Sequence, residues 1–467
     1  MKSRVCLDAE LAGDWRYSLE MHMKTPQTPP DLSSILRQLS EEPLQLARIL
    51  NLQQRLDFVD EYLHWDELRR RKAPEGLTHR QWWLVLKFSR NAGTRQLELR
   101  DLSGRPFRFS MVEAVQERLE PISRQGSGKL QLPEDVFNRD MRDRYIVRSL
   151  VEEAITSSQL EGAATTRLVA KEMLRSQRRP RDTGERMILN NYHAMEYIRS
   201  IGREPMNEER LLEVHRRVTT GTLDCPDYEG RFRTAQDNPV AVSTLYNEVY
   251  HTAPPAEELP GRIRAMLEFA NGKDSRRYVH PVVRAIILHF WLAYDHPFMD
   301  GNGRTARALF YWAMLNQGYW VFEFISISQI IKKAPAKYER AFLYSETDDN
   351  DLTYFIVYHL DVIDRALEEL FAVVERKTQA LRETESMMRS AAGFNYRQLA
   401  LLSHALRHPG AVYSAQSHRT SHNVTDQTAR NDLYALCRKG LLIGRKKGRT
   451  TYYHPAEDLE AKLRQQE

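Results

Sequence analysis

The apolar residues of this chain recur mostly at the three- and four-residue spacing of α-helices. Residues 32–71 set leucines and isoleucines among charged side chains in this way, which predicts amphipathic helices. Residues 96–110 differ, because apolar and polar residues alternate on either side of a turn at Ser103 and Gly104. Such alternation around a tight turn is typical of a β-hairpin. We therefore expect a helical N-terminal region with one hairpin.

The longest helical pattern occupies residues 143–376 and has two interruptions. The basic, proline-broken stretch 175–186 is expected to be an exposed, solvated connection. Residues 225–255 contain prolines and short β-branched runs, which predict a loop with a small hairpin. Residues 281–294 begin with proline and are apolar on all sides, so we expect them to form a buried central helix.

The last part of the chain, residues 395–455, reads as helix, turn, helix, short strand, basic turn and strand. Thr425 is a suitable N-cap for the second helix, whose leucines mark its buried side. This order resembles a winged helix-turn-helix module. Two uses of the module stay open. One is protein contact or dimerisation, and the other is DNA binding through the helix from Thr425 and the basic residues Arg430, Lys446, Lys447 and Arg449.

Length and composition indicate a multidomain globular protein. The 467 residues suffice for about two to four domains, and 42% hydrophobic with 28% charged residues is ordinary for this class. No stretch approaches the ~20 apolar residues of a membrane-spanning helix, and the start lacks the apolar segment of a secretory signal. We therefore expect a cytoplasmic protein. Its net charge of +5 is too small to indicate nucleic-acid binding by itself.

The three cysteines do not predict a metal or redox site. Cys6, Cys225 and Cys437 are too far apart in sequence for any of the familiar ligand or redox spacings, and free, buried thiols are expected. Two histidines near the predicted central helix, His280 and His289, have no ligand partner in the pattern either. We expect them to be a helix-start residue and a core residue.

Residues 296–307 combine a histidine with a segment suited to phosphate groups. His296 follows the predicted central helix, and the two glycines in Asp300-Gly301-Asn302-Gly303 permit turns that point successive amides into one concavity. A second apolar helix begins at once, so the concavity lies at a helix N-terminus with its positive dipole. The pattern predicts an anion-binding loop beside a base.

The charged residues of this segment extend the chemistry. Arg304 and Arg307 are three apart and can reach the same oxyanions from one helix face. Asp300 is a hard carboxylate that suits magnesium beside a polyphosphate, and His296 is suited to act as a general base at neutral pH. These are the parts needed for nucleotidyl or phosphoryl transfer.

The same twelve residues match the signature H-x-F-x-[D/E]-G-N-G-R-x-x-R at every fixed position, and the chain therefore resembles the Fic/DOC family. Residues 230–233, the proline pair at 254–255 and the region of Tyr338 extend the resemblance over about half of the chain. The resemblance implies a helical domain that transfers AMP from Mg-ATP to a Ser, Thr or Tyr hydroxyl of a protein. It also implies that the hairpin in residues 236–252 is a flap that aligns the target by strand addition.

By position in the signature, the resemblance implies a role for each site residue. His296 is the base and Asp300 the magnesium ligand, while Phe298 anchors the loop. Tyr338 is expected either to line the adenine pocket or to belong to the core. The phosphate-binding residues are expected to be Gly301, Asn302, Gly303, Arg304 and Arg307.

A second motif, Ser157-Ser158-Gln159-Leu160-Glu161-Gly162, is similar to the inhibitory motif [S/T]-x-x-x-E-[G/N] of the family. Ser157 and Glu161 are four apart and share one face of a predicted helix. The family precedent implies that Glu161 pairs with Arg307 and keeps the γ-phosphate from its productive position. In some relatives this glutamate also supports removal of AMP from the target.

These patterns lead to one expectation for the whole chain. The fold class is mainly α: a helical Fic domain with a small β-hairpin flap, an accessory N-terminal region and a C-terminal winged helix. The expected boundaries are 1–142, 143–376, a helical linker at 377–394, and 395–467. The expected partners are ATP, a protein target or the chain itself, and DNA, protein or a second copy at the winged helix.

Two other functions stay open. A Fic enzyme can transfer another nucleotide or a whole phosphate, because a phosphate cradle does not read the base. Alternatively, the chain is a DNA-binding regulator whose Fic domain senses nucleotide.

Overall fold

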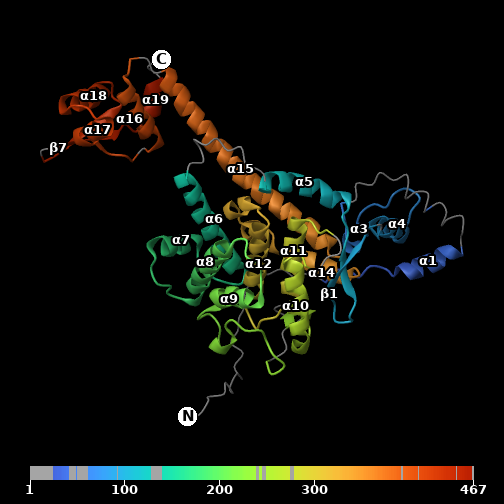
Figure 1. Cartoon of the computed structure of the whole chain (residues 1–467). Coiled ribbons are helices and arrows are strands. Elements are labelled where there is room, and N and C mark those ends of the chain that lie inside the picture. The colour runs from blue at the N-terminus through green and yellow to red at the C-terminus, as the bar shows by residue number, and fades with distance from the viewer. Residues whose placement is uncertain are drawn as a thin grey trace, which may run out of the picture. The chain divides into compact units, whose positions relative to one another are not determined.

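The computed structural model describes residues 25–41, 49, 61–91, 93–127, 139–237, 241–243, 249–273, 278–390, 393–408, 410–448 and 450–464. The protein is mainly helical with few strands, which confirms the predicted fold class (Figure 1). It divides into two compact units, Met1–Gln131 with Arg139–Leu370, and Leu132–Asn138 with Phe371–Glu467. The finer domain boundaries expected from the sequence stay a prediction.

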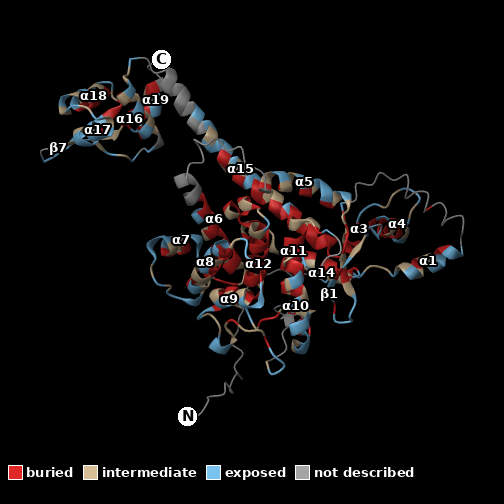
Figure 2. Ribbon diagram, in the orientation of Figure 1, coloured by how far each residue is buried: buried red, intermediate tan, exposed pale blue. Residues whose placement is uncertain are grey.

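Two adjacent helices form the centre of the first unit. α11 (Pro281–Asp295) and α12 (Asn302–Asn316) pack against each other, and both are buried along almost their whole length (Figure 2). The predicted central helix is thereby confirmed. His280 caps the start of α11 by accepting the Val282 N–H, and His289 is fully buried, so both histidines have the structural places expected of them.

A layer of helices surrounds this pair, and its members contact α11, α12 or one another. They are α6 (Arg139–Leu160), α7 (Arg167–Ser176), α8 (Thr183–Ile201), α9 (Glu208–Thr219), α10 (Leu259–Ala270), α13 (Ile327–Lys333) and α14 (Pro335–Thr347). Three short 3-10 helices connect them, η1 (Pro226–Tyr228), η2 (Ala256–Glu258) and η3 (Trp320–Phe324).

The N-terminal part has the expected hairpin. β1 (Arg95–Arg100) and β2 (Pro106–Phe109) pair antiparallel, with Arg95 opposite Phe109. The helices described here are α1 (Leu32–Ser40), α3 (Trp65–Leu68), α4 (His79–Asn91) and α5 (Glu113–Ser127). Of the stretch 32–71 predicted as helical, residues 42–48 and 50–60 lie outside the described residues.

Two connections can be compared with their predictions. β3 (Ala241–Ser243) and β4 (Val249–Thr252) pair antiparallel, which confirms the small hairpin of the 225–255 loop, although its turn lies outside the described residues. The prediction that all of 175–186 is an exposed connection is wrong. α8 begins at Thr183 because Asp182 accepts the Glu185 N–H at 2.7 Å, and only residues 177–182 separate the helices.

This connection is also less solvated than expected. Arg178 Nη1 and Nη2 donate to the buried Glu185 carboxylate at 2.7 and 2.6 Å. A guanidinium that forms two parallel bonds to a buried carboxylate is a structural contact. The expectation of a wholly solvated charge run therefore fails at Arg178, and it holds for the exposed Arg179 and Arg181.

The C-terminal module, residues 393–464, follows α15 (Thr353–Ser390). It contains α16 (Tyr396–Arg407), β5 (Tyr413–Ser414), α17 (Ala415–His422), α18 (Asp426–Arg438), β6 (Leu442–Lys447), β7 (Thr450–Pro455) and α19 (Leu459–Arg464). The three strands form an antiparallel sheet in the order β5-β7-β6. Thr425 caps α18 as predicted, by accepting the Thr428 N–H. The assignment as a winged helix stays a prediction.

In the part of the chain that the structure describes, no helix is both long enough and apolar enough to cross a membrane. The described cysteines, Cys225 and Cys437, are free thiols, but both are half-buried, so the expectation that they are buried is wrong.

Candidate active site

A short loop joins the two central helices and carries most of the predicted site residues. α11 ends at Asp295, and His296 follows in the left-handed conformation with a φ of 44°. Gly301 precedes α12 with a φ of 80°, a conformation that favours glycine. A Cβ at Gly301 would lie 2.6 Å from Thr219 Cγ2, so this turn has no space for a side chain.

The side chain of Asn302 holds the loop closed. Its Oδ1 accepts the Phe298 N–H at 3.0 Å, and its Nδ2 donates to the Phe298 carbonyl at 2.9 Å. Phe298 is fully buried, as expected for a loop anchor. The Asn302 amide is therefore occupied within the loop, and its backbone N–H is the group that it offers to a ligand.

The first turn of α12 presents backbone N–H groups without a capping side chain. Gly301 is the N-cap and makes no side-chain cap, while Asn302 and Gly303 are the first two helical residues. The N–H groups of a first turn have no partner within their own helix, and the helix dipole adds partial positive charge there. This end of α12 is consequently suited to an anion.

His215 on α9 packs against the loop and bonds to it. The sequence did not predict this role. Its ring stacks on Phe298 with centroids 3.7 Å apart and planes 5° from parallel. Its Nδ1 accepts the Gly230 N–H at 3.0 Å, so the proton lies on Nε2, which donates to the Asp300 carbonyl at 2.9 Å. Burial lowers the pKa of His215 to about 4, which keeps the ring neutral. One ring thus connects the loop to two other segments.

The protonation state of His296 follows from its hydrogen bond. Nδ1 lies 3.0 Å from the Ala293 carbonyl, which can only accept, so Nδ1 carries the proton. Burial is the largest influence on His296 and lowers its pKa to about 4. The ring is therefore neutral at physiological pH, and Nε2 has an unprotonated lone pair. This is the state that a general base requires.

The backbone around His296 is held by a buried arginine, Arg233. Its Nε donates to the His296 carbonyl at 2.8 Å, and its Nη2 donates to the carbonyls of Asp295 and Pro254 at 3.1 and 2.5 Å. Its own N–H donates to the Pro297 carbonyl. The sequence alone gives residues 230–233 no structural role, whereas in the structure Arg233 joins the end of α11 to the segment after β4.

Arg307 connects the central helix α12 to the end of α6. Its Nε donates to Ser157 Oγ at 2.8 Å, and its Nη2 donates to the Ser157 carbonyl at 3.0 Å and to Glu161 Oε1 at 2.7 Å. Burial works to raise the pKa of Glu161, but the Arg307 guanidinium outweighs it and the pKa of the carboxyl is lowered. The pair is therefore ionised at neutral pH. The structure thus brings Ser157, Glu161 and Arg307 together, although 146 residues separate the last two in sequence.

The Glu161 carboxylate also lies against the first turn of α12. A Cβ at Gly303 would collide with the Glu161 carboxylate, so only glycine permits this close approach. Gly162 follows with a φ of 96° and lets the chain leave α6 directly after the glutamate. The side chain of Glu161 remains 29% exposed. The Glu161 carboxylate, an anion of the chain itself, consequently lies at the N-terminus of α12, the helix end that is suited to an anion.

Arg304 and Asp300 offer further groups to a phosphate-bearing ligand. Arg304 is 1% exposed and donates through Nη1 to the Val218 carbonyl at 2.8 Å. Its Nε is among the buried atoms of the described side chains that have no hydrogen-bond partner. Asp300 is 59% exposed, accepts the Gly301 N–H, and lies 3.7 Å from Arg304 Nη2. An oxyanion would satisfy the buried donor, which otherwise carries a desolvation cost.

A magnesium ion fits this donor set only together with a substrate. Among the described residues, no group of three or more His, Cys, Asp or Glu is arranged to hold a metal ion. Magnesium is commonly held by one or two carboxylates, by waters and by substrate phosphates, without a cage of protein ligands. The exposed carboxylate of Asp300 suits that mode of binding.

The hydroxyl of Tyr338, on α14, lies beside the buried ring of His289. The hydroxyl lies 2.9 Å from His289 Nε2, and burial raises the pKa of Tyr338 to about 12 even though the neighbouring Arg307 guanidinium lowers it. Tyr338 therefore lies close enough to Arg307 and Glu161 for their charges to act on its pKa. Whether its ring lines an adenine pocket stays a prediction.

Part of the chain that carries this site is similar to a known protein family. Residues 205–314 match the model of the Fic/DOC family. The match includes α9 with His215, Arg233, the strands β3 and β4, and all of residues 296–307. This segment is similar to a Fic domain. The inhibitory pair of Ser157 and Glu161 lies before the matched Fic segment, and Tyr338 lies after it.

Relatives and a solved structure agree with this identification. The protein adenylyltransferase Fic of Nematostella vectensis is 26% identical over 238 residues, which cover 50% of this chain and 52% of that protein. The protein adenylyltransferase fic-1 of Caenorhabditis elegans is 36% identical over 109 residues, 23% of this chain and 19% of that protein. The chain therefore spans about half or less of the length of these relatives.

A crystal structure of a Fic family protein from Desulfovibrio desulfuricans resembles the fold more broadly. It covers 74% of this chain and 97% of its own chain with a TM-score of 0.53 and 18% identity. At that identity the likeness concerns the fold alone. It confirms the mainly helical Fic architecture.

Proposed function

We propose that the protein is an adenylyltransferase that moves AMP from ATP to a Ser, Thr or Tyr hydroxyl of a protein. The observation that carries the proposal is the state of His296. Its ring is neutral with the proton on Nδ1, so Nε2 has an unprotonated lone pair, and His296 belongs to the loop that leads to the N-terminus of α12. The names of the Nematostella and Caenorhabditis relatives support the transfer of AMP over that of another group.

In the proposed reaction, one bond to the α-phosphorus forms, one breaks, and a proton is transferred. The target hydroxyl oxygen attacks the α-phosphorus of ATP and forms a new P–O bond, while its proton passes to His296 Nε2. The bond between the α-phosphorus and the oxygen that bridges to the β-phosphate breaks, and pyrophosphate leaves. The amides of the first turn of α12, with Arg304 and Arg307, would neutralise the charge that collects on the phosphate oxygens.

Asp300 would hold magnesium in this reaction together with the substrate phosphates. A bound magnesium ion supplies charge neutralisation for a polyphosphate. The chain's own contribution is to leave the Asp300 carboxylate exposed while His215 holds the Asp300 carbonyl and the Gly301 N–H donates to Oδ1 of its side chain.

Glu161 would act as an internal inhibitor of the transfer. Its carboxylate binds Arg307 and lies against Gly303, so it takes up two groups that a bound polyphosphate needs. Ser157 accepts a hydrogen bond from Arg307 Nε and so holds the guanidinium in the orientation that binds Glu161. While Glu161 is paired with Arg307, the rate of AMP transfer is expected to be low. Removal of AMP from a target would use the same glutamate.

A variant of the proposed base tests the activity. In Glu161→Gly protein, a further His296→Ala substitution should abolish transfer of labelled AMP and leave ATP affinity nearly unchanged, because His296 contacts the hydroxyl and not the phosphate cradle. Equilibrium binding of ATP and incorporation of label measure the two effects. Transfer at an undiminished rate would reject the assignment of the base.

A further inference from the structure

The C-terminal module carries the positive charge of this protein. Residues 393–464 contain twelve Arg or Lys and five Asp or Glu, whereas the whole chain has 68 and 63. The net excess of basic residues in the chain is therefore concentrated in this segment. Three of the five acidic residues, Glu457, Asp458 and Glu460, belong to α19 or precede it directly. The remaining elements of the module are strongly basic.

One face of α18 is exposed, polar and rich in hydrogen-bonding groups. Its exposed residues recur at spacings of three and four, so they lie along one side of the helix: Gln427, Arg430, Asn431, Tyr434 and Arg438. The opposite side buries Leu433 and Leu436 in the core of the module. Arg, Asn and Gln are the side chains that pair in two places with the edges of bases.

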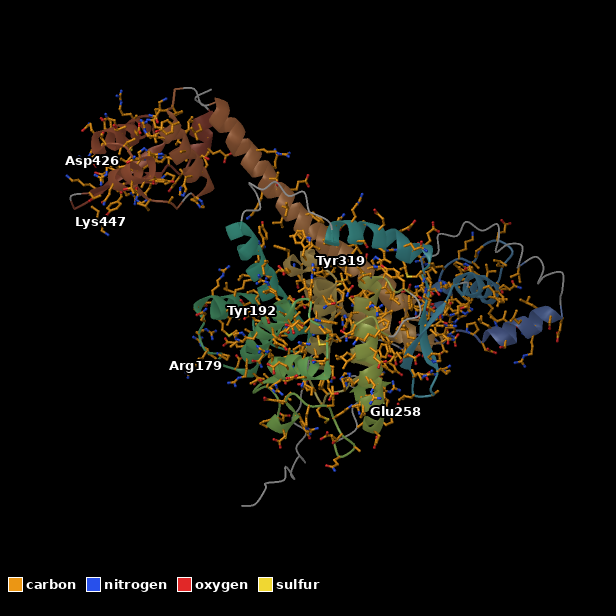
Figure 3. All side chains as sticks on the ribbon, viewed as in Figure 1. Arg179, Tyr192, Glu258, Tyr319, Asp426 and Lys447 are labelled. Atoms are coloured by element: carbon orange, nitrogen blue, oxygen red, sulfur yellow. The ribbon has the colours of Figure 1, made fainter. Side chains whose placement is uncertain are left out.

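The hairpin after α18 carries a second basic group. Arg445, Lys446 and Lys447 are consecutive, exposed residues of β6, next to the turn into β7. Figure 3 labels Asp426 at the start of α18 and Lys447 in the hairpin, and both lie on the same side of the module in that view. α18 also packs against β6, so the helix and the hairpin belong to one rigid body.

We propose that this module binds double-stranded DNA, with α18 in the major groove and the β6–β7 hairpin on the phosphates. The major groove of B-DNA is about 12 Å wide and admits a helix, and base edges there are read by side chains such as those on the exposed side of α18. Lysines at the hairpin neutralise phosphates without reading sequence. The charge excess of the module is complementary to such a partner.

The shape of the surface favours duplex DNA over RNA. The deep, narrow major groove of an RNA duplex does not admit a helix, and single strands are bound on platforms of stacked aromatic rings. The exposed face of α18 carries one aromatic residue, Tyr434, among polar ones. A projecting polar helix beside a basic hairpin matches the duplex.

An ion pair within α18 reduces the positive charge of this surface. Arg430 Nε donates to Asp426 Oδ2 at 2.8 Å, and both side chains are largely exposed. The carboxylate repels phosphates and holds Arg430 back from a base or phosphate. The Asp426→Asn substitution should therefore tighten DNA binding, because it removes a negative charge and frees the guanidinium.

The fold of the module does not depend on these exposed residues. Its helices are joined by the buried Asp432, which accepts from Asn395 Nδ2 at 2.8 Å, from Arg397 Nε at 2.7 Å and from His418 Nε2 at 3.2 Å. Substitutions on the exposed side of α18 or in the hairpin leave this hub intact. They can therefore test binding without unfolding the module.

The test is fluorescence anisotropy of the full chain with a labelled duplex of random sequence and about 20 base pairs, roughly two helical turns. We expect binding at low salt whose logarithm falls linearly with the logarithm of salt concentration. A Lys446→Ala/Lys447→Ala variant should bind about tenfold more weakly or worse, with a salt slope shallower by about two. Asp426→Asn should bind more tightly than the parent.

Exposed lysines outside the module provide the matched control. Lys72→Ala/Lys273→Ala removes the same charge from other parts of the chain and should leave affinity and salt slope unchanged. An equal loss in this control would overturn the proposal, because binding would then follow net charge alone. Absence of salt-dependent duplex binding would overturn it too, as would single-stranded RNA binding that duplex DNA does not compete.

Discussion

A single carboxylate, that of Glu161, contacts two of the groups that we propose to bind phosphate. It binds Arg307 at 2.7 Å and excludes a Cβ at Gly303, so it contacts two of the residues proposed to hold ATP. His296 is close enough for the charge of Glu161 to act on its pKa. The proposed base and the proposed inhibitor therefore belong to one site, and Glu161 can be substituted without changing His296.

Glu161→Gly should raise the rate of AMP transfer by at least about tenfold, because it frees a guanidinium that can neutralise charge in the transition state. Incorporation of labelled AMP into protein measures the rate. Glu161→Gln is the matched control: its amide oxygen can still accept from Arg307, but the charge is lost, so an intermediate rate is expected. A Glu161→Gly rate equal to that of the parent would contradict an inhibitory role.

The pKa of His296 predicts an unusual pH profile. A base is active when deprotonated, and a pKa of about 4 leaves His296 deprotonated throughout the neutral range. Transfer by Glu161→Gly protein should therefore stay level between about pH 6 and pH 8 and fall only as the pH approaches the lowered pKa. A rate that halves near pH 6.5, the ordinary pKa of histidine, would contradict the burial of this ring.

At the scale of elements, the loop between α11 and α12 is held by segments distant in sequence. His215 from α9 stacks on Phe298 and bonds to both Gly230 and Asp300, while Arg233 binds the carbonyls at the end of α11. The conformation of His296 thus depends on contacts that the loop itself does not contain. A loss of such contacts should lower the rate without removing any group that touches substrate.

His215→Ala should lower kcat of the Glu161→Gly protein by about tenfold or more, because small displacements of catalytic groups are costly. His215→Gln is expected to recover much of the loss, since its amide can donate to the Asp300 carbonyl and accept from the Gly230 N–H as the imidazole does. Steady-state kinetics with ATP and a target measure both variants. Equal defects in the two variants would show that ring stacking alone matters.

The sequence predicted these elements unevenly, for physical reasons. Pro281 and the glycines mark where α11 and α12 begin, so local rules suffice for the helices, the hairpins and the loop between them. The spacing of Ser157 and Glu161 predicted their shared face, and the contact with Arg307 followed from the family resemblance. His215 and Arg233 were not predicted, because their roles come from packing between distant segments. A charge run was misread at Arg178, where a buried partner seven residues later decides the outcome.

At the scale of the molecule, a buried ion pair joins the N-terminal helices to the rest of the first compact unit. Lys87 Nζ on α4 lies 2.8 Å from Asp348 Oδ1 at the end of α14, and the two side chains are 1% and 2% exposed. Tyr354 donates to the same carboxylate at 2.7 Å. A buried charge that loses its partner is strongly destabilising.

Lys87→Met should therefore lower the free energy of unfolding of this unit by about 3–5 kcal/mol, because Asp348 stays buried without its cation. Denaturant unfolding followed by tryptophan fluorescence measures the change. Lys333→Met breaks the exposed pair with Glu369 and should cost about 1 kcal/mol or less. Equal costs for the two substitutions would contradict the structural role assigned to the buried pair.

Intact-mass measurement of Glu161→Gly protein incubated with magnesium and each nucleoside triphosphate tests the central claim most directly. The account predicts an added mass of one AMP group on the protein or on a mixed-in target with ATP, and none when His296→Ala is also present. Added mass of a phosphate group, or of another nucleotide in preference to AMP, would contradict the proposed reaction. So would AMP transfer that persists without His296.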